Sequence, residues 1–179
     1  VFAVLYLALA IKQNILCWSA WILSSCLYTY VMYSAGLYME ALLQIFYVCM
    51  GIYGWHQWLN KNSTEQELSV STWEPVKHVS AVTLIFVLAY ASGLLLEKYT
   101  AAALPFLDAL TTWGAIVTTY MVANKVLENW IYWFVIDSIS IYLFISRELY
   151  FTALLFFVYL FMIVIGYRTW KQSRVAVND

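Results

Sequence analysis

A carboxylate inside an apolar stretch is the residue of this sequence best placed to do chemistry. Asp137 lies within the run from Glu128 to Ser146, which is apolar enough to cross a membrane. A charged side chain near the middle of a bilayer costs about 2.5 to 3.5 kcal/mol on insertion scales, so such residues usually face a polar cavity and mark a pathway or a site. No Lys or Arg inside a predicted span is available to pair with it.

Two tryptophans share the helical face of this carboxylate. Trp130, Trp133 and Asp137 are spaced i, i+3, i+7, which places them on one side of a helix. Indole rings and a carboxylate on one face can hold a flat cationic ring, by stacking and by charge. The structural alternative is that Asp137 pairs with a neighbouring helix while the tryptophans pack.

Further polar residues lie on other apolar stretches. Gln44 and Tyr47 share a face with Gly51, which suits a polar lining, although Gln44 can instead bond to another helix. Trp18 heads a similar stripe with Trp21, Ser25 and Tyr28. We expect Gln44, Tyr47 and Trp18 to contribute to binding.

Three more residues, Asp108, Thr112 and Asn129, are candidates for the site. Asp108 and Thr112 follow Pro105. We expect Thr112 to hydrogen-bond a ligand, whereas Asp108 either lines an entrance or stabilises the start of a helix through the helix dipole. Asn129 lies with Asn124 and Lys125 at one end of the predicted spans, where such residues can gate a path or cap a helix.

The sequence carries little that supports catalysis. It has no His/Cys/carboxylate cluster with metal-ligand spacing, no glycine-rich phosphate loop and no Ser-His-Asp set. We therefore predict no enzyme activity, no catalytic residue, no metal and no cofactor. A net charge of −1 also argues against a nucleic-acid partner.

The composition indicates an all-α integral membrane protein. The chain has 179 residues, of which 64% are hydrophobic and 11% charged, against about 25% charged in soluble domains. A spanning helix needs about 20 apolar residues. We predict seven transmembrane helices: Val1–Ile11, Ile15–Gly36, Glu40–Leu59, Val79–Leu96, Ala101–Ala123, Asn129–Ser146 and Leu149–Tyr167. The first is about half of a span, so we expect further residues to precede it. Asn60–Lys77 reads as a solvated loop.

The basic residues predict the orientation of the helices. A cytoplasmic C-terminus puts Lys12, Lys61, Lys77, Lys125, Arg168, Lys171 and Arg174 inside, and Lys98 and Arg147 outside. Because Lys and Arg concentrate in cytoplasmic loops, this bias favours a cytoplasmic C-terminus and, with seven spans, an N-terminus outside.

An internal repeat relates the two halves. Asn14 and Trp18 match Asn129 and Trp133 at an offset of 115, and after a three-residue gap Gly54 and other positions match at an offset of 112. We predict a three-helix repeat over 1–59, a loop and linker helix over 60–100, and a second repeat and tail over 101–179. Such parallel repeats, in a 3+1+3 arrangement, occur in SWEET sugar transporters, with the substrate near the midplane.

Two stretches carry a family resemblance. ALLQIFYVCMGIYGWHQW, and LDALTTWGAIVTTYMVANKVLENWIYWFVIDSISIYLF, resemble the PnuC family of bacterial vitamin transporters over nearly the whole chain. The resemblance implies a SWEET-like fold in the inner membrane, trimeric assembly and facilitated diffusion of nicotinamide riboside. It also implies that a cytoplasmic kinase traps the cargo.

Two departures bear on the cargo. Nicotinamide riboside members often carry a Lys-Ile-Ser-Asn-Tyr-like stretch at the start of the second helix, where this chain has Gln13 to Trp18. They also tend to have Asn in place of Asp137. The thiamine branch, PnuT, is more similar at the start of the second helix, so thiamine is slightly favoured over nicotinamide riboside. Proton- or sodium-coupled uptake, or a membrane scaffold that transports nothing, are the alternatives.

Overall fold

The computed structural model describes residues 2–34, 38–59, 68–99 and 104–178, and these residues form seven α-helices. The predicted all-α architecture is therefore confirmed. The helices are α1 (Phe2–Ile11), α2 (Leu16–Ser34), α3 (Tyr38–Leu59), α4 (Pro75–Tyr99), α5 (Pro105–Ala123), α6 (Asn129–Ser146) and α7 (Tyr150–Asn178).

Two predicted boundaries need correction. Helix α4 begins at Pro75, so the predicted loop Asn60–Lys77 is too long at its C-terminal end. Proline suits the first turn of a helix because the amide hydrogen that it lacks would have no partner there. Residues 60–67 of that loop lie outside the described residues. Helix α7 continues to Asn178, well past the predicted end at Tyr167.

Four of the described helices, α4 to α7, are long and apolar enough to cross a membrane by length and composition. Helices satisfy their own backbone hydrogen bonds, which is why apolar helices can reside in the hydrocarbon of a bilayer. Four such helices fit a multi-pass membrane protein.

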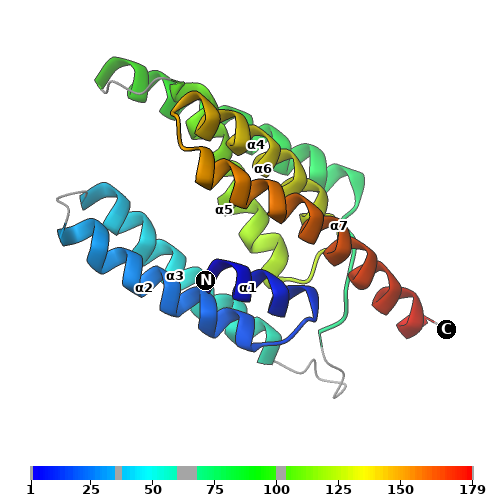
Figure 1. Cartoon of the computed structure of the whole chain (residues 1–179). Helices are drawn as coiled ribbons and strands as arrows, with labels where there is room; N and C mark the ends of the chain where they lie inside the picture. Colours follow the sequence, from blue (N-terminus) through cyan, green and yellow to red (C-terminus); the bar gives the residue numbers. More distant parts are fainter. Residues whose placement is uncertain (1, 35–37, 60–67, 100–103, 179) are drawn as a thin grey trace.

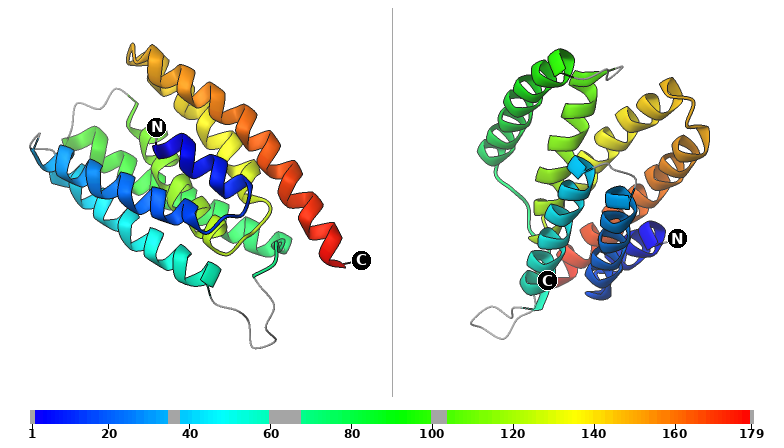
Figure 2. Two further views of the ribbon diagram at one scale, coloured as in Figure 1. Left: turned by 60° about the horizontal axis from the view of Figure 1, so that its bottom comes forward. Right: turned by 90° about the vertical axis from the view of Figure 1, so that its left-hand side faces the viewer.

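The helices form two groups that lie side by side (Figure 1). One group is α1 to α3 and the other contains α5 to α7. The groups meet where α1 packs against α7 and where α3 packs against α5. Helix α4 packs chiefly against α5 and lies at the outer edge of the bundle (Figure 2). It also contacts α6, where His78 Nδ1 lies 3.0 Å from the hydroxyl of Tyr132.

Corresponding turns in the two groups have the same geometry. Gln13 between α1 and α2, and Lys125 between α5 and α6, both have a positive φ, at 52° and 47°. The amide of Gln13 donates to the oxygen of Ala10 at 3.0 Å, and the amide of Lys125 donates to the oxygen of Val122 at 3.0 Å. Each member of these pairs lies 112 residues from its counterpart.

The same offset relates two close contacts between a tryptophan and a glycine. A Cβ added at Gly54 would overlap the ring of Trp18, and one added at Gly166 would overlap the ring of Trp130. The structural counterpart of Trp18 is therefore Trp130. The prediction that Trp18 corresponds to Trp133 was wrong, because the three-residue gap moved helix two out of register.

A reciprocal pair of hydrogen bonds connects the two groups. The indole nitrogen of Trp58 in α3 donates to the oxygens of Val122 and Ala123 at the end of α5, at 3.3 and 3.1 Å. The indole nitrogen of Trp170 in α7 donates to the oxygen of Ala10 in α1 at 3.0 Å. Both donors, and the acceptors Val122 and Ala10, are related by 112 residues, so each group holds the other through the same interaction.

Four rings form what we name the tryptophan cluster: Trp18, Trp58, Trp130 and Trp170. Trp18 meets Trp58 edge to face with centroids 5.6 Å apart, and Trp130 meets Trp170 in the same way at 5.4 Å. Trp58 and Trp170 meet at 6.3 Å, which joins the two pairs. The cluster is the centre of the buried core where α1, α3, α5 and α7 end or approach their ends.

Candidate substrate site

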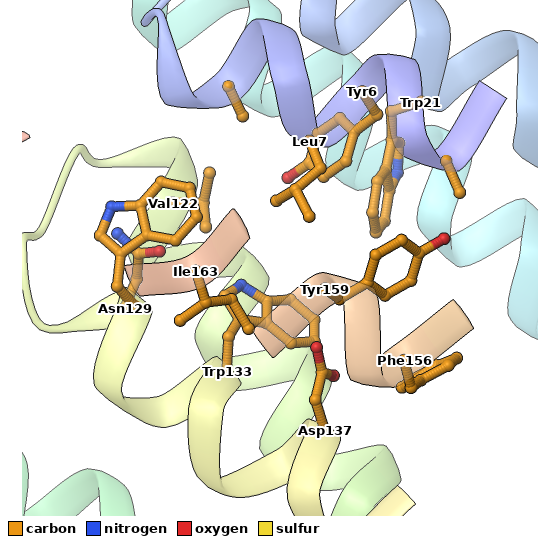
Figure 3. A pocket seen from close by; sticks show the side chains of 13 residues that line it. Tyr6, Leu7, Trp21, Val122, Asn129, Trp133, Asp137, Phe156, Tyr159 and Ile163 are labelled. Carbon is orange, nitrogen blue, oxygen red and sulfur yellow. The ribbon is translucent and has the colours of Figure 1, made fainter. Parts of the chain in front are cut away.

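A cavity of about 150 Å³ lies beside the tryptophan cluster and is lined by α1, α2, α6, α7 and the end of α5. Along α6 its wall includes Asn129, Trp130, Trp133 and Asp137. Figure 3 shows Trp133 and Asp137 directed from α6 into the same space that Tyr6 and Trp21 approach from α1 and α2. We refer to this space as the α6 cavity.

Asp137 enters the α6 cavity as a buried carboxylate. The residue is 5% exposed, and no described residue pairs or hydrogen-bonds with its carboxylate. The alternative in which Asp137 pairs with a neighbouring helix is therefore not what the described residues show. A buried charge is costly unless it is paired. A positively charged group inside the cavity would supply the partner that the described residues do not provide.

Aromatic rings surround this carboxylate. Trp133 and Tyr159 line the cavity from α6 and α7. On the opposite side, Trp21 packs against Tyr6 with ring centroids 4.8 Å apart. Its indole nitrogen donates to the backbone oxygen of Tyr47 at 2.8 Å, which fixes the orientation of the ring. The α6 cavity thus combines π faces with one carboxyl group, a combination that favours cations when that group is ionised.

A second cavity, of about 350 Å³, adjoins the first and is named here the α2 cavity. The two cavities share Tyr6, Trp21 and Phe156 as walls, together with Ala3. The lining residues of the α2 cavity that belong to α2 and α3 are Trp21, Ser24, Ser25, Tyr28, Gln44 and Tyr47. The predicted residues Gln44 and Tyr47 are therefore brought to a cavity contiguous with that of Asp137.

Asn129 lies at the end of the α6 cavity nearest the tryptophan cluster. Its amide nitrogen donates to the oxygen of Val126 at 2.6 Å, whereas its side-chain oxygen is buried without a hydrogen-bond partner among the described residues. An unpaired buried acceptor costs about 1 to 3 kcal/mol. A ligand with an amide or amino donor would relieve this cost.

Trp18 is placed elsewhere than the sequence predicted. The residue is fully buried, its ring covers Gly54, and it packs edge-on against Trp58. Neither cavity is lined by it. The structure thus places Trp18, which the sequence predicted to contribute to binding, in the core, and Trp21 lines the α6 cavity across from Trp133.

Asp108 and Thr112 also lie outside both cavities. Asp108 is in the first turn of α5 and forms a 3.0 Å ion pair with Arg147, which follows the end of α6. Thr112 donates from its hydroxyl to the backbone oxygen of Asp108 at 2.9 Å. Of the two interpretations of Asp108, its position favours stabilisation of the helix start and of the α5–α6 contact.

The lining residues that the sequence did not assign to the site include Trp21, Tyr6 and Tyr159. The signal for Trp21 was present, because an offset of 112 carried through the second helix matches Trp21 with Trp133. The same offset matches Tyr47 with Tyr159. Tyr6 had no comparable signal, since its position depends on how α1 packs.

Comparison with known proteins places this geometry in a family. The family model described as "Nicotinamide mononucleotide transporter" matches residues 1–172. The chain belongs to this family. Its members and structural relatives are transporters and not enzymes, so the chain is a transporter, and its predicted membership of the PnuC family is confirmed.

Relatives in this family have named cargoes. The chain is 26% identical to the nicotinamide riboside transporter PnuC of Escherichia coli K12, covering 82% of this chain and 72% of that protein. PnuC of Shigella flexneri gives the same values. The riboflavin/roseoflavin transporter RibM of Streptomyces davaonensis is 25% identical, covering 92% of this chain and 78% of RibM.

A solved structure shares the fold. The chain superposes on the crystal structure of the vitamin B3 transporter PnuC with a TM-score of 0.74 and 24% identity, covering 98% of this chain and 80% of that chain. At this identity the likeness establishes the arrangement of the helices.

Proposed function

We propose that this protein takes up a vitamin that carries a positively charged flat ring. The observation that supports the proposal is Asp137, a buried carboxylate in a cavity walled by Trp21 and Trp133 and without a partner among the described residues. The cargo ring stacks on Trp133, its charge is offset by Asp137, and Asn129 accepts a hydrogen bond from its amide or amino group. Gln44 and Tyr47 bind the remainder of the cargo.

Nicotinamide riboside is the first candidate cargo, and thiamine is the second. Both have a cationic aromatic ring. The relatives reported above are named for nicotinamide riboside and riboflavin, and none of them for thiamine. The slight preference for thiamine rests on the start of the second helix alone, so we place it after nicotinamide riboside. Riboflavin has a neutral ring and would leave the Asp137 charge without a partner.

Two parallel three-helix repeats joined by α4, in a SWEET-like 3+1+3 arrangement, account for movement of the cargo. The reciprocal hydrogen bonds of Trp58 and Trp170 and the equivalent turns at Gln13 and Lys125 support this division. Rocking of one repeat against the other would expose the cavities to alternate sides. The tryptophan cluster is then the closed end of the path.

Orientation and energetics complete the proposal. The protein lies in the bacterial inner membrane as a trimer. Its N-terminus is outside and its C-terminus is in the cytoplasm, an orientation that the distribution of Lys and Arg favours. The tryptophan cluster then closes the cytoplasmic end. Transport is facilitated diffusion, and a cytoplasmic kinase keeps the cargo inside by phosphorylating it.

The proposal is tested by uptake into proteoliposomes. Purified protein is reconstituted without an ion gradient, and entry of radiolabelled nicotinamide riboside, thiamine and riboflavin is compared. We expect uptake of nicotinamide riboside to exceed that of riboflavin and to stop at equal concentrations on both sides. Equal uptake of charged and neutral vitamins, or uptake unaffected in both Trp133→Ala and Asp137→Asn, would remove the assignment of the site.

Ion-coupled uptake is the second candidate because Asp137 is buried and unpaired. A carboxylate in that position can carry a proton or hold a sodium ion. Accumulation of cargo above its external concentration when a proton or sodium gradient is imposed would favour coupling. A scaffold that transports nothing predicts binding without counterflow in the same vesicles.

A further inference from the structure

Positions in α2 and α6 correspond one to one at an offset of 112. The match is fixed where the two helices begin, because Gln13 and Lys125 have equivalent turns and Trp18 and Trp130 cover equivalent glycines. Both α2 and α6 continue as uninterrupted helices from this point. Residues farther along α2 therefore correspond to residues farther along α6 at the same offset. Ser25 is thereby the counterpart of Asp137.

Ser25 and Asp137 occupy equivalent positions that differ in charge. Each is 5% exposed. Each lies four residues, about one helical turn, after a tryptophan that lines the cavities, which is Trp21 for Ser25 and Trp133 for Asp137. Ser25 lines the α2 cavity and Asp137 the α6 cavity, and these cavities share walls. Among the described residues, no side chain hydrogen-bonds to the Ser25 hydroxyl.

We infer that Ser25 determines the direction in which the cargo binds. The two halves of the site offer similar aromatic walls, so a flat ring could enter either half. The carboxylate in one half and the hydroxyl in the other remove this ambiguity: the cationic ring lies beside Asp137, and Ser25 hydrogen-bonds the uncharged polar end of the cargo. A second carboxylate at Ser25 would place two like charges around a cargo with one positive charge.

This inference rests on the proposed function and is tested by exchanging the two residues. Binding of nicotinamide riboside and of its dihydro form, whose ring is neutral, is measured to the wild-type chain, Asp137→Ser and the double variant Ser25→Asp/Asp137→Ser. Asp137→Ser should bind the charged form at least about tenfold more weakly than the wild-type chain does. This variant should also no longer prefer the charged form over the neutral form. The double variant should regain that preference, because the ring can then bind in the other half.

The wild-type measurement distinguishes failure of the proposed function from failure of the role assigned to Ser25. If neither nicotinamide riboside nor thiamine binds the wild-type chain, the proposed function fails. If thiamine alone binds, thiamine and its uncharged deaza analogue replace the two riboside forms. If the wild-type chain prefers the charged form and a folded double variant does not, Ser25 lacks the assigned role while the proposed function stands.

A second variant covers the possibility that Ser25→Asp prevents folding. Ser25→Cys is made with Cys26→Ala and Cys49→Ala, and its modification by a methanethiosulfonate reagent is followed with and without nicotinamide riboside. We expect the cargo to slow modification at position 25. The matched control keeps Cys26, which is exposed and lines neither cavity, and has Ser25 and Cys49→Ala; its modification should not change. Modification at position 25 that saturating cargo leaves unchanged would overturn the inference.

Discussion

The indole nitrogen of Trp170 donates a hydrogen bond to the backbone oxygen of Ala10 at 3.0 Å, across 160 positions of the chain. Its counterpart, Trp58, donates in the same way to the end of α5. The two bonds join the end of each helical group to the other group. Any motion that separates the groups at this end has to break both of them.

Removing either indole donor should weaken this closure. Trp170→Phe and Trp58→Phe keep an aromatic ring and lose one hydrogen bond each, worth about 0.5 to 1.5 kcal/mol. We expect both to lower the melting temperature by similar amounts and to change the rate of cargo exchange in the same direction.

Trp113→Phe is the matched control for these two variants. Its indole donates to the hydroxyl of Ser92 at 3.0 Å, a contact between α4 and α5 that does not join the two groups. It should lower stability without altering exchange. Exchange rates in Trp58→Phe and Trp170→Phe that equal the wild-type rate would show that the cluster is not the closed end of the path.

The two glycines beneath the tryptophan rings should not tolerate a methyl group. In Gly54→Ala and Gly166→Ala the added carbon would overlap Trp18 or Trp130, which are almost fully buried and have little room to move. We expect each to lose about 1 to 3 kcal/mol of stability, measured by thermal unfolding in detergent. Gly114→Ala is the control, since its Cβ would lie 3.1 Å from the flexible end of Ile136; a loss there as large as the other two would contradict this reasoning.

Neutralising Asp137 should separate binding from stability. Asp137→Asn keeps the shape of the side chain, removes a buried unpaired charge and should not reduce thermal stability. It should lower the affinity for a cationic vitamin by at least about tenfold. Asp108→Asn removes an exposed ion pair with Arg147 and should change neither property by much. Isothermal titration and thermal unfolding of both variants give the comparison.

Trp18 and Trp133, which the sequence repeat matched with each other, should respond differently to substitution. Trp133→Ala and Trp21→Ala remove walls of the α6 cavity, so they should reduce cargo affinity more than stability. Trp18→Ala leaves a hole in the buried core and should chiefly lower stability, by about 3 to 5 kcal/mol. Affinity loss in a stable Trp18→Ala protein would restore its predicted role in binding.

Much of the architecture was predictable because a membrane helix is recognisable from the length and hydropathy of its own segment. Length and hydropathy predicted every helix from the residues of that segment alone, and the ends of α6 were predicted without error. Asp137 was recognisable for a related reason: a charge within an apolar helix needs an explanation whatever the fold. The motifs around Trp133 were sufficient to recognise the family.

The sequence by itself determined that this is a helical membrane transporter with a carboxylate in an apolar span. The tertiary structure decided which residues meet that carboxylate. Trp18 and Trp21 lie on one face of α2, and only the packing of Trp18 on Gly54 assigns one to the core and the other to the cavity. Periodicity fixes the face of a helix, whereas the depth at which a side chain contacts its neighbours depends on how the helices pack against each other.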